Sequence, residues 1–225
     1  MGRALEFASG GDRVQAYVAT PASGRGPGVV VIQEWWGLVD HIRDVCDRLA
    51  REGFVALAPD LYRGETASDP DRAGRLMMGL EIPRAARDLD GAVHALQSQS
   101  EVVGARVGAI GFCMGGQLAL FAATRNAKIG AVVDCYGVHP HVTLDLAGLE
   151  AAVLGIFAEQ DAFVPAEAVR TLEAELRAAG KRAHCTIYPG VDHAFLNDTR
   201  ADVYDANAAS RAWAEIVAFL RAELS

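Results

Sequence analysis

The chain has 225 residues, 51% of them hydrophobic, and a formal net charge of −8 at pH 7. This composition can build a full hydrophobic core and argues against a disordered protein. The acidic balance, with Lys and Arg scattered, argues against nucleic acid or an anionic membrane as the main partner. No apolar run approaches the roughly 20 residues that span a bilayer, and no apolar leader follows the first residues. We therefore expect a cytoplasmic protein, a monomer or homodimer.

Apolar patterning predicts an N-terminal hairpin followed by strands that alternate with helices. The predicted strands cover residues 3–9, 12–20, 28–32, 54–58, 129–135, 152–157 and 183–188, and a strand, turn and helix cover 107–119. The other predicted helices cover 38–52, 83–99, 165–179 and 203–222. Residues 63–82 predict a loop with one short helix, where substrate covers tend to lie. The alternation predicts one α/β domain over residues 1–225, with a mostly parallel sheet and helices on both faces.

The turn between the strand and helix of 107–119 has the spacing of a nucleophile elbow. Gly111–Gly115 reads Gly-Phe-Cys-Met-Gly, with Cys113 where this motif more often has serine. Glycines two residues either side leave room for a strained turn that lifts the central side chain above the sheet. The backbone N–H of Met114 would then face a developing oxyanion. A plain glycine turn between a strand and a helix would have a similar sequence.

Residues at the carboxyl ends of the predicted strands supply partners for this cysteine, because functional groups of a parallel sheet collect there. Cys113, Asp161 and His193 follow in the order nucleophile, acid, histidine, which is the order of triad members in α/β-hydrolases. A thiol attacks as its thiolate, so a histidine that takes its proton and an acid that orients the histidine form a coherent set. The full set of strand-end residues is Glu34, Asp60, Cys113, Tyr136, Asp161 and His193.

Several of these residues have simpler interpretations. Asp161 could be a turn residue ahead of a helix, and Asp192 is a second acid, although a sequence neighbour of His193 usually points elsewhere. His139 and His141 form an H-x-H pair, but without further ligands we expect no metal or cofactor. Trp35 and Trp36 could be core or pocket walls. We expect packing or surface roles for His41, His94 and His184, and the remaining cysteines as small hydrophobic residues: Cys46, Cys135 and Cys185.

Taken together, five segments resemble the dienelactone hydrolase family, whose members are α/β-hydrolases with a Cys-His-Asp triad. The resemblance runs from about residue 12 to residue 222. It implies Cys113 as nucleophile and His193 as base. The segments that carry it are Gly111–Gly116, Gln33–Gly37, Ala58–Tyr62, Asp161 and Asp192–Phe195.

The resemblance also assigns Asp161 to orient the base, Glu34 to control the ionisation of the thiol, and the backbone N–H groups of Trp35 and Met114 to the oxyanion hole. A carboxylate beside the thiol disfavours the thiolate. We therefore predict that Cys113 rests protonated until substrate displaces Glu34.

One position departs from the family pattern. Dienelactone-cleaving members hold the substrate carboxylate with two arginines, and the place of one of them, four residues after His193, is Asn197 here. Arg72 or Arg75 could supply the other. We therefore expect a hydrolase of a lactone or carboxylic ester, with a small-molecule substrate that need not be a dienelactone. The candidate substrate-binding residues are Trp36, Tyr62, Arg72, Arg75, Tyr136, Phe195 and Asn197.

Two other functions remain open on the same fold. One is another esterase, a thioesterase or a peptidase, although peptidases of this superfamily usually carry extra domains. The other is a non-catalytic ligand-binding scaffold, although such proteins typically lose a triad member, and all three are present here.

Overall fold

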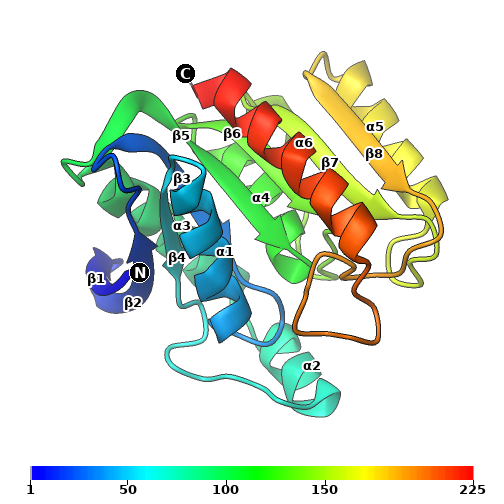
Figure 1. Cartoon of the computed structure of the whole chain (residues 1–225), viewed down its shortest axis with the longest axis horizontal. Coiled ribbons are helices and arrows are strands. Elements are labelled where there is room, and N and C mark those ends of the chain that lie inside the picture. The colour runs from blue at the N-terminus through cyan, green and yellow to red at the C-terminus, as the bar shows by residue number, and fades with distance from the viewer. Residues whose placement is uncertain (1, 225) are drawn as a thin grey trace.

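A computed structural model describes residues 2–224, so Met1 and Ser225, the ends of the predicted domain, lie outside the described residues. Eight strands form one sheet in the order β1-β2-β4-β3-β5-β6-β7-β8 (Figure 1). The first two pairs, β1 with β2 and β2 with β4, are antiparallel, and all later pairs are parallel. The strands are β1 (Arg3–Ser9), β2 (Asp12–Ala19), β3 (Gly26–Ile32), β4 (Val55–Pro59), β5 (Val102–Phe112), β6 (Ile129–Cys135), β7 (Ala152–Ala158) and β8 (Ala183–Tyr188).

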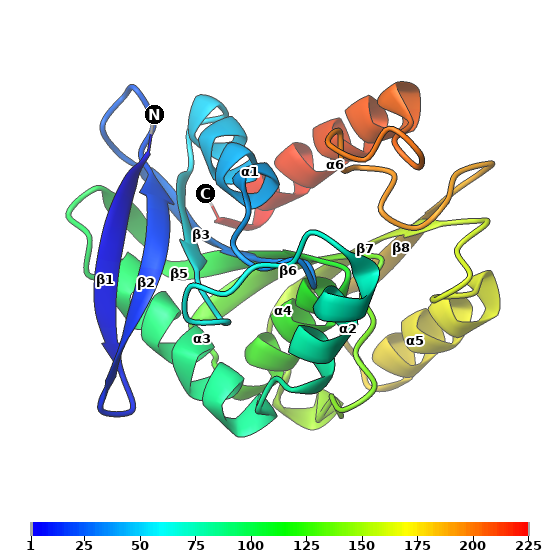
Figure 2. The same ribbon diagram turned by 90° about the horizontal axis from the view of Figure 1, so that it is seen from below.

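Helices cover both faces of the sheet (Figure 2). Two of them, α1 (Asp40–Arg51) and α6 (Ala206–Leu224), pack on one face, and α3 (Ile82–Gln97), α4 (Met114–Arg125) and α5 (Ala166–Ala178) pack on the other. The short helix α2 (Pro70–Met78) lies beyond the carboxyl ends of the central strands, and a 3₁₀ turn covers Leu146–Gly148. This arrangement confirms the predicted fold class.

The central strands are apolar throughout because neither face meets water. Every residue of β4, β6 and β7 is buried, and β3 is buried over Val29–Ile32. Continuous apolar runs of this kind are typical of parallel strands between two helical layers. The α1 helix instead presents one apolar stripe, which includes Ile42, Val45 and Leu49, to the sheet. None of the helices between residues 2 and 224 is both long and apolar enough to cross a membrane.

The predicted elements agree with the observed ones to within a few residues, including the one short helix within residues 63–82, and one difference is informative. β5 begins at Val102, five residues before the predicted start, because its first residues continue the pairing with Gly26 and Pro27 of β3. Within residues 63–82 the one helix is α2, which begins at a proline and is capped by Asp69.

Strand order brings the predicted functional residues together. β3, β5, β6, β7 and β8 are consecutive neighbours and run parallel, so their carboxyl ends open onto one edge. The turns after them carry, in the same order, Glu34, Cys113, Tyr136, Asp161 and His193.

Candidate active site

The elbow at Cys113 is strained, as the motif predicts. Cys113 has φ 54° and ψ −125°, a backbone conformation that L-residues rarely adopt. Its flanking glycines are required sterically: a Cβ at Gly111 would overlap the backbone of Gly115, and a Cβ at Gly115 would overlap the carbonyl groups of Ile32 and Gln33. The turn therefore presses α4 against β5 and β3 and presents the thiol at the top of the sheet.

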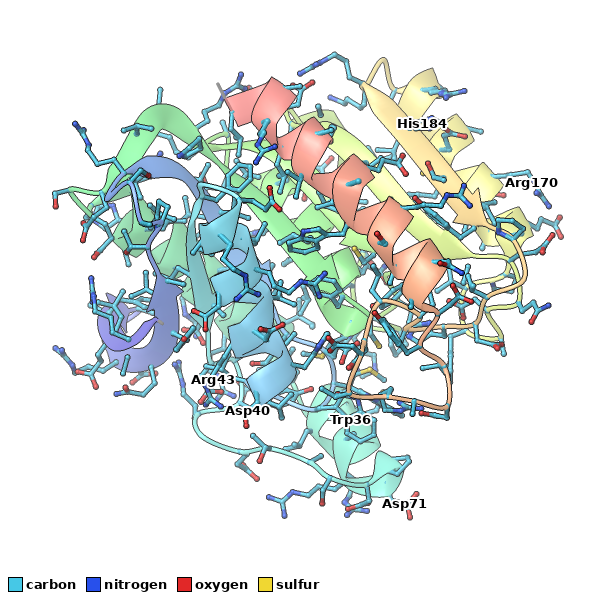
Figure 3. All side chains as sticks on the ribbon, viewed as in Figure 1. Trp36, Asp40, Arg43, Asp71, Arg170 and His184 are labelled. Atoms are coloured by element: carbon cyan, nitrogen blue, oxygen red, sulfur yellow. The ribbon has the colours of Figure 1, made fainter. Side chains whose placement is uncertain are left out.

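A cavity of about 640 Å³ opens above this elbow. The thiol of Cys113, the ring of His193 and the carboxyl of Glu34 all line it, and most of the remaining wall is apolar. This volume lies within the range of pockets that hold a small organic ligand. Trp36, which lies beside α2 in Figure 3, forms part of the wall. The other lining residues include Trp35, Met77, Val138, Phe163, Asp192, Arg200 and Val203.

Asp161 is fixed between its own turn and His193. Its Oδ1 accepts hydrogen bonds from the backbone N–H groups of Phe163 at 2.7 Å and Val164 at 2.9 Å. Its Oδ2 lies 2.7 Å from Nδ1 of His193. Asp161 is thus both a turn residue and the partner of the histidine. The contact leaves Nε2 of His193 as the nitrogen available to exchange protons in the cavity.

The environment of Cys113 disfavours ionisation of its thiol. Burial, followed by the charge of Glu34, raises the pKa of the thiol to about 12. The backbone N–H groups of Met114 and Trp35 favour the thiolate and act in the opposite direction. These are the same two groups that the resemblance assigns to the oxyanion hole. Burial is the larger cause of the raised pKa, whereas reasoning from the sequence named only the carboxylate.

Glu34 is itself buried, with 1% of its surface exposed, and Asn197 holds it. Nδ2 of Asn197 donates to Oε2 of Glu34 at 2.8 Å, and Oδ1 of Asn197 accepts from the backbone N–H and the hydroxyl of Thr199. Burial raises the pKa of the Glu34 carboxyl, and the charges of His41, His193 and Arg200 oppose that shift. At the position where the family pattern predicts an arginine, the side chain is thus a neutral amide that binds Glu34.

The structure separates the candidate substrate-binding residues into three groups. Trp36 lines the cavity. Arg72 and Arg75 are exposed on α2 and do not line it, and Arg72 pairs with Glu65. The remaining four are buried supports that do not line the cavity, namely Tyr62, Tyr136, Phe195 and Asn197.

Two of these supports contact the elbow and His193 directly. The hydroxyl of Tyr62 donates to the sulfur of Met114 at 3.1 Å, beneath the elbow. The ring of Tyr136 packs on His193, with centroids 5.0 Å apart. Asp60, the last strand-end residue, accepts from the backbone N–H of Tyr62 at 3.0 Å, so it shapes a turn.

Three features of the site escaped reasoning from the sequence. Phe163 lies two residues after Asp161 and packs on His193, and Arg200 lines the cavity. His41 is buried, and neither ring nitrogen has a hydrogen-bond partner. Its Nδ1 lies 3.6 Å from Oδ1 of Asp198, and its charge acts to lower the pKa of Glu34. Residue spacing carries a weak signal for Phe163 and none for the others, because their contacts depend on how distant loops fold.

Across residues 2–224, no three His, Cys, Asp or Glu side chains gather in a way that could hold a metal ion. His139 is buried and its Nδ1 accepts from the backbone N–H of His141 at 3.1 Å. The H-x-H pair therefore closes its own turn.

Comparison with known proteins identifies the family of this chain. The family model described as "Dienelactone hydrolase family" matches residues 14–224. The protein called usf from Aquifex pyrophilus is 38% identical over all of both chains, and an Aquifex aeolicus protein, provisionally named a carboxymethylenebutenolidase, is 36% identical over all of both chains. A Klebsiella pneumoniae crystal structure, provisionally titled a dienelactone hydrolase, superposes with a TM-score of 0.88 at 32% identity and covers 98% of each chain. The chain therefore belongs to the dienelactone hydrolase family of the α/β-hydrolase superfamily.

Proposed function

We propose that this protein is a cysteine-dependent hydrolase of lactones or carboxylic esters that acts through Cys113, His193 and Asp161. Membership of a hydrolase family supports the reaction type. The observation that carries the mechanism is the convergence of a strained Cys113 and an Asp161-bound His193 at one cavity, with the backbone N–H groups of Trp35 and Met114 close enough to favour the thiolate.

The reaction follows from these positions. Nε2 of His193 takes the thiol proton, and the thiolate attacks the ester carbonyl carbon while the N–H groups of Trp35 and Met114 receive the carbonyl oxygen. The tetrahedral intermediate then collapses: the carbon–oxygen bond to the alcohol breaks, and His193 returns the proton to that oxygen. This leaves a thioester on Cys113. His193 next deprotonates a water, which attacks the thioester and releases the acid and the thiol.

In the absence of substrate the site is held inactive. Burial and Glu34 keep the thiol protonated, which protects it from oxidation and alkylation. Asn197 holds Glu34 in this position. A substrate that enters the cavity displaces the Glu34 carboxylate from the thiol, so the nucleophile forms only when there is an ester to attack.

The charges around the cavity favour a neutral substrate. Where two arginines were expected, Asn197 is neutral and binds Glu34, and neither Arg72 nor Arg75 lines the cavity. Arg200 does line it, but its guanidinium forms a two-pronged contact with Asp202. An uncharged lactone or ester therefore fits the cavity better than a dienelactone carboxylate.

A substrate panel tests this function. p-Nitrophenyl acetate, simple lactones, and cis- and trans-dienelactone would be assayed with wild type, Cys113→Ala and Cys113→Ser. We expect cleavage of the neutral substrates by wild type, with the dienelactones poor substrates, and loss of activity in Cys113→Ala. Ester turnover that survives Cys113→Ala would refute the mechanism, and binding without turnover in wild type would favour a ligand-binding scaffold.

A further inference from the structure

We propose that Phe163 is a specificity-determining residue that binds an apolar, aryl-type alcohol half of the substrate ester. This inference rests on the function proposed above and adds a substrate class to it. Phe163 has 63% of its surface exposed, the largest fraction among the exposed large hydrophobic residues within residues 2–224. Its ring lines the cavity. An exposed aromatic ring at the mouth of an apolar cavity is typical of a ligand-binding surface.

Phe163 is not needed as core. The ring of His193 already packs against the buried ring of Tyr136 on one side, at 5.0 Å between centroids. Phe163 packs on the same ring at 5.0 Å, edge to face, with an interplanar angle of 64°. The imidazole thus has a buried aromatic support and an exposed aromatic neighbour, and only the exposed one has surface left to bind another group.

The backbone of Phe163 is held in place. Its N–H donates to Oδ1 of Asp161 at 2.7 Å, and the other oxygen of the same carboxyl contacts His193. The carboxyl that orients the base therefore also orients the turn that carries Phe163. The position of the ring relative to His193 is built into the site, which limits the entropy lost on binding a substrate.

The chemistry decides which half of the ester Phe163 meets. The departing alcohol oxygen takes its proton from His193, so this oxygen must lie at the imidazole when the bond breaks. The ring of Phe163 is next to that imidazole. The acyl half stays attached to Cys113 at that moment. Phe163 is therefore placed to contact the alcohol half.

The other walls agree with an apolar group. Trp35, Met77, Val138 and Val203 line the cavity. The guanidinium of Arg200 lies over the ring of Trp36 at 5.8 Å and is paired with Asp202. An aromatic alcohol group between Phe163 and these walls would remove apolar surface from water without requiring a new polar partner.

Three neutral esters separate the two halves of the substrate: phenyl acetate, 4-tert-butylphenyl acetate and phenyl butyrate. Hydrolysis would be followed by pH-stat titration so that all three are measured alike. For wild type we expect kcat/KM to be about tenfold higher for 4-tert-butylphenyl acetate than for phenyl acetate, as burial of roughly 55 Å² of apolar surface would give.

Variants of Phe163 then locate the preference. The alcohol preference is the ratio of kcat/KM for 4-tert-butylphenyl acetate to kcat/KM for phenyl acetate. Phe163→Ser should reduce this ratio to about twofold or less. Phe163→Leu, which keeps an apolar side chain, should retain at least half of the wild-type ratio. The acyl preference, which is the ratio of kcat/KM for phenyl butyrate to kcat/KM for phenyl acetate, should change by less than about twofold in either variant. Tyr204→Ser is the matched control, because Tyr204 is an aromatic with 38% of its surface exposed that does not line the cavity; it should keep the wild-type preference.

The proposal would be overturned if wild type showed no alcohol preference, or if the preference survived Phe163→Ser. It would also be overturned if Phe163→Ser lowered kcat/KM equally for all three esters, which would mean that Phe163 only orients His193. An acyl preference that changes as much as the alcohol preference would place Phe163 on the other half of the substrate. Failure of wild type to cleave any of these esters, or cleavage that survives Cys113→Ala, would instead refute the proposed function itself.

Discussion

Replacing Glu34 by Gln tests how the thiol is held back. The change removes one negative charge but keeps the shape and an oxygen that can accept from Asn197. A carboxylate close to an ionisable group shifts its pKa by about one to three units. The Glu34 charge is the second cause, after burial, of the Cys113 pKa near 12. We therefore expect the pKa of the thiol to fall by about one unit in Glu34→Gln and to remain above that of a free thiol.

The assay is the rate of alkylation by iodoacetamide between pH 7 and pH 10. Only the thiolate reacts, so one unit of pKa corresponds to about a tenfold faster reaction at every pH in this range. In wild type the rate should rise about tenfold per pH unit without a plateau, since the pKa lies above the range. The other cysteine that could react is the half-buried Cys185, so all measurements use a Cys185→Ser background, with Cys113→Ala as the blank.

Asp192→Asn is the matched control, because Asp192 lines the same cavity but is not among the groups that act on the thiol. It should leave the alkylation rate within about twofold of wild type. An unchanged or slower rate in Glu34→Gln would refute the idea that this carboxylate restrains the thiol. Equal acceleration in both variants would show a general loss of negative charge instead.

Four further substitutions test other parts of the structure. Asp161→Asn keeps the turn but loses the charge that stabilises the imidazolium. We therefore expect kcat/KM for p-nitrophenyl acetate to fall about 10³-fold or more, with little change in the melting temperature. A loss below tenfold would contradict the role of Asp161. Gly115→Ala should lower the free energy of unfolding by about 3 kcal/mol or more, measured by urea denaturation, because its Cβ overlaps backbone of β3. Gly74→Ala, on α2 with open space around the new Cβ, should instead stabilise by about 0.5–1 kcal/mol, and equal effects of the two would refute the steric argument. Burial raises the pKa of the Asp134 carboxyl to about 7. The folded state therefore binds the carboxyl proton more tightly than the unfolded state does, and the free energy of unfolding falls as pH rises from about 4 to 7. Asp134→Asn should remove this part of the pH dependence, as measured by urea titrations at several pH values. If the free energy of unfolding fell with pH as steeply in the variant as in wild type, the role of Asp134 would be refuted.

Much of the fold could be predicted because its causes are local. A run such as Val29–Ile32 is apolar on both faces only if helices cover both sides of the strand, and the order of strands and helices then restricts the topology. The glycines around Cys113 report a strained turn for the same reason, since any side chain there would overlap backbone. The order of the predicted strands was therefore enough to predict that Cys113, Asp161 and His193 lie at one edge of the sheet.

The parts that could not be predicted depend on contacts between distant loops. The hydrogen bond between Asn197 and Glu34 joins residues 163 positions apart, and nothing in either segment indicates the other. Arg75 seemed available for substrate because helical spacing cannot show which face of α2 meets the cavity, and its exposed position outside the cavity wall was visible only in three dimensions. Phe163 was also missed, although its position two residues after Asp161 is a weak local signal, because the turn held by the Asp161 carboxyl also fixes the backbone of Phe163.

The contact between Asn197 and Glu34 also has a consequence for how the protein is made. The proposed nucleophile, Cys113, lies near the middle of the chain, but the proposed base, His193, and Asn197, which holds Glu34, follow β8. A ribosome-bound chain that has completed β6 already carries Cys113, yet it has neither His193 to activate the thiol nor Asn197 to hold the restraining carboxylate. The C-terminal segment thus supplies both the proposed base and the residue that holds Glu34, and the site is complete only once this segment has docked against the sheet.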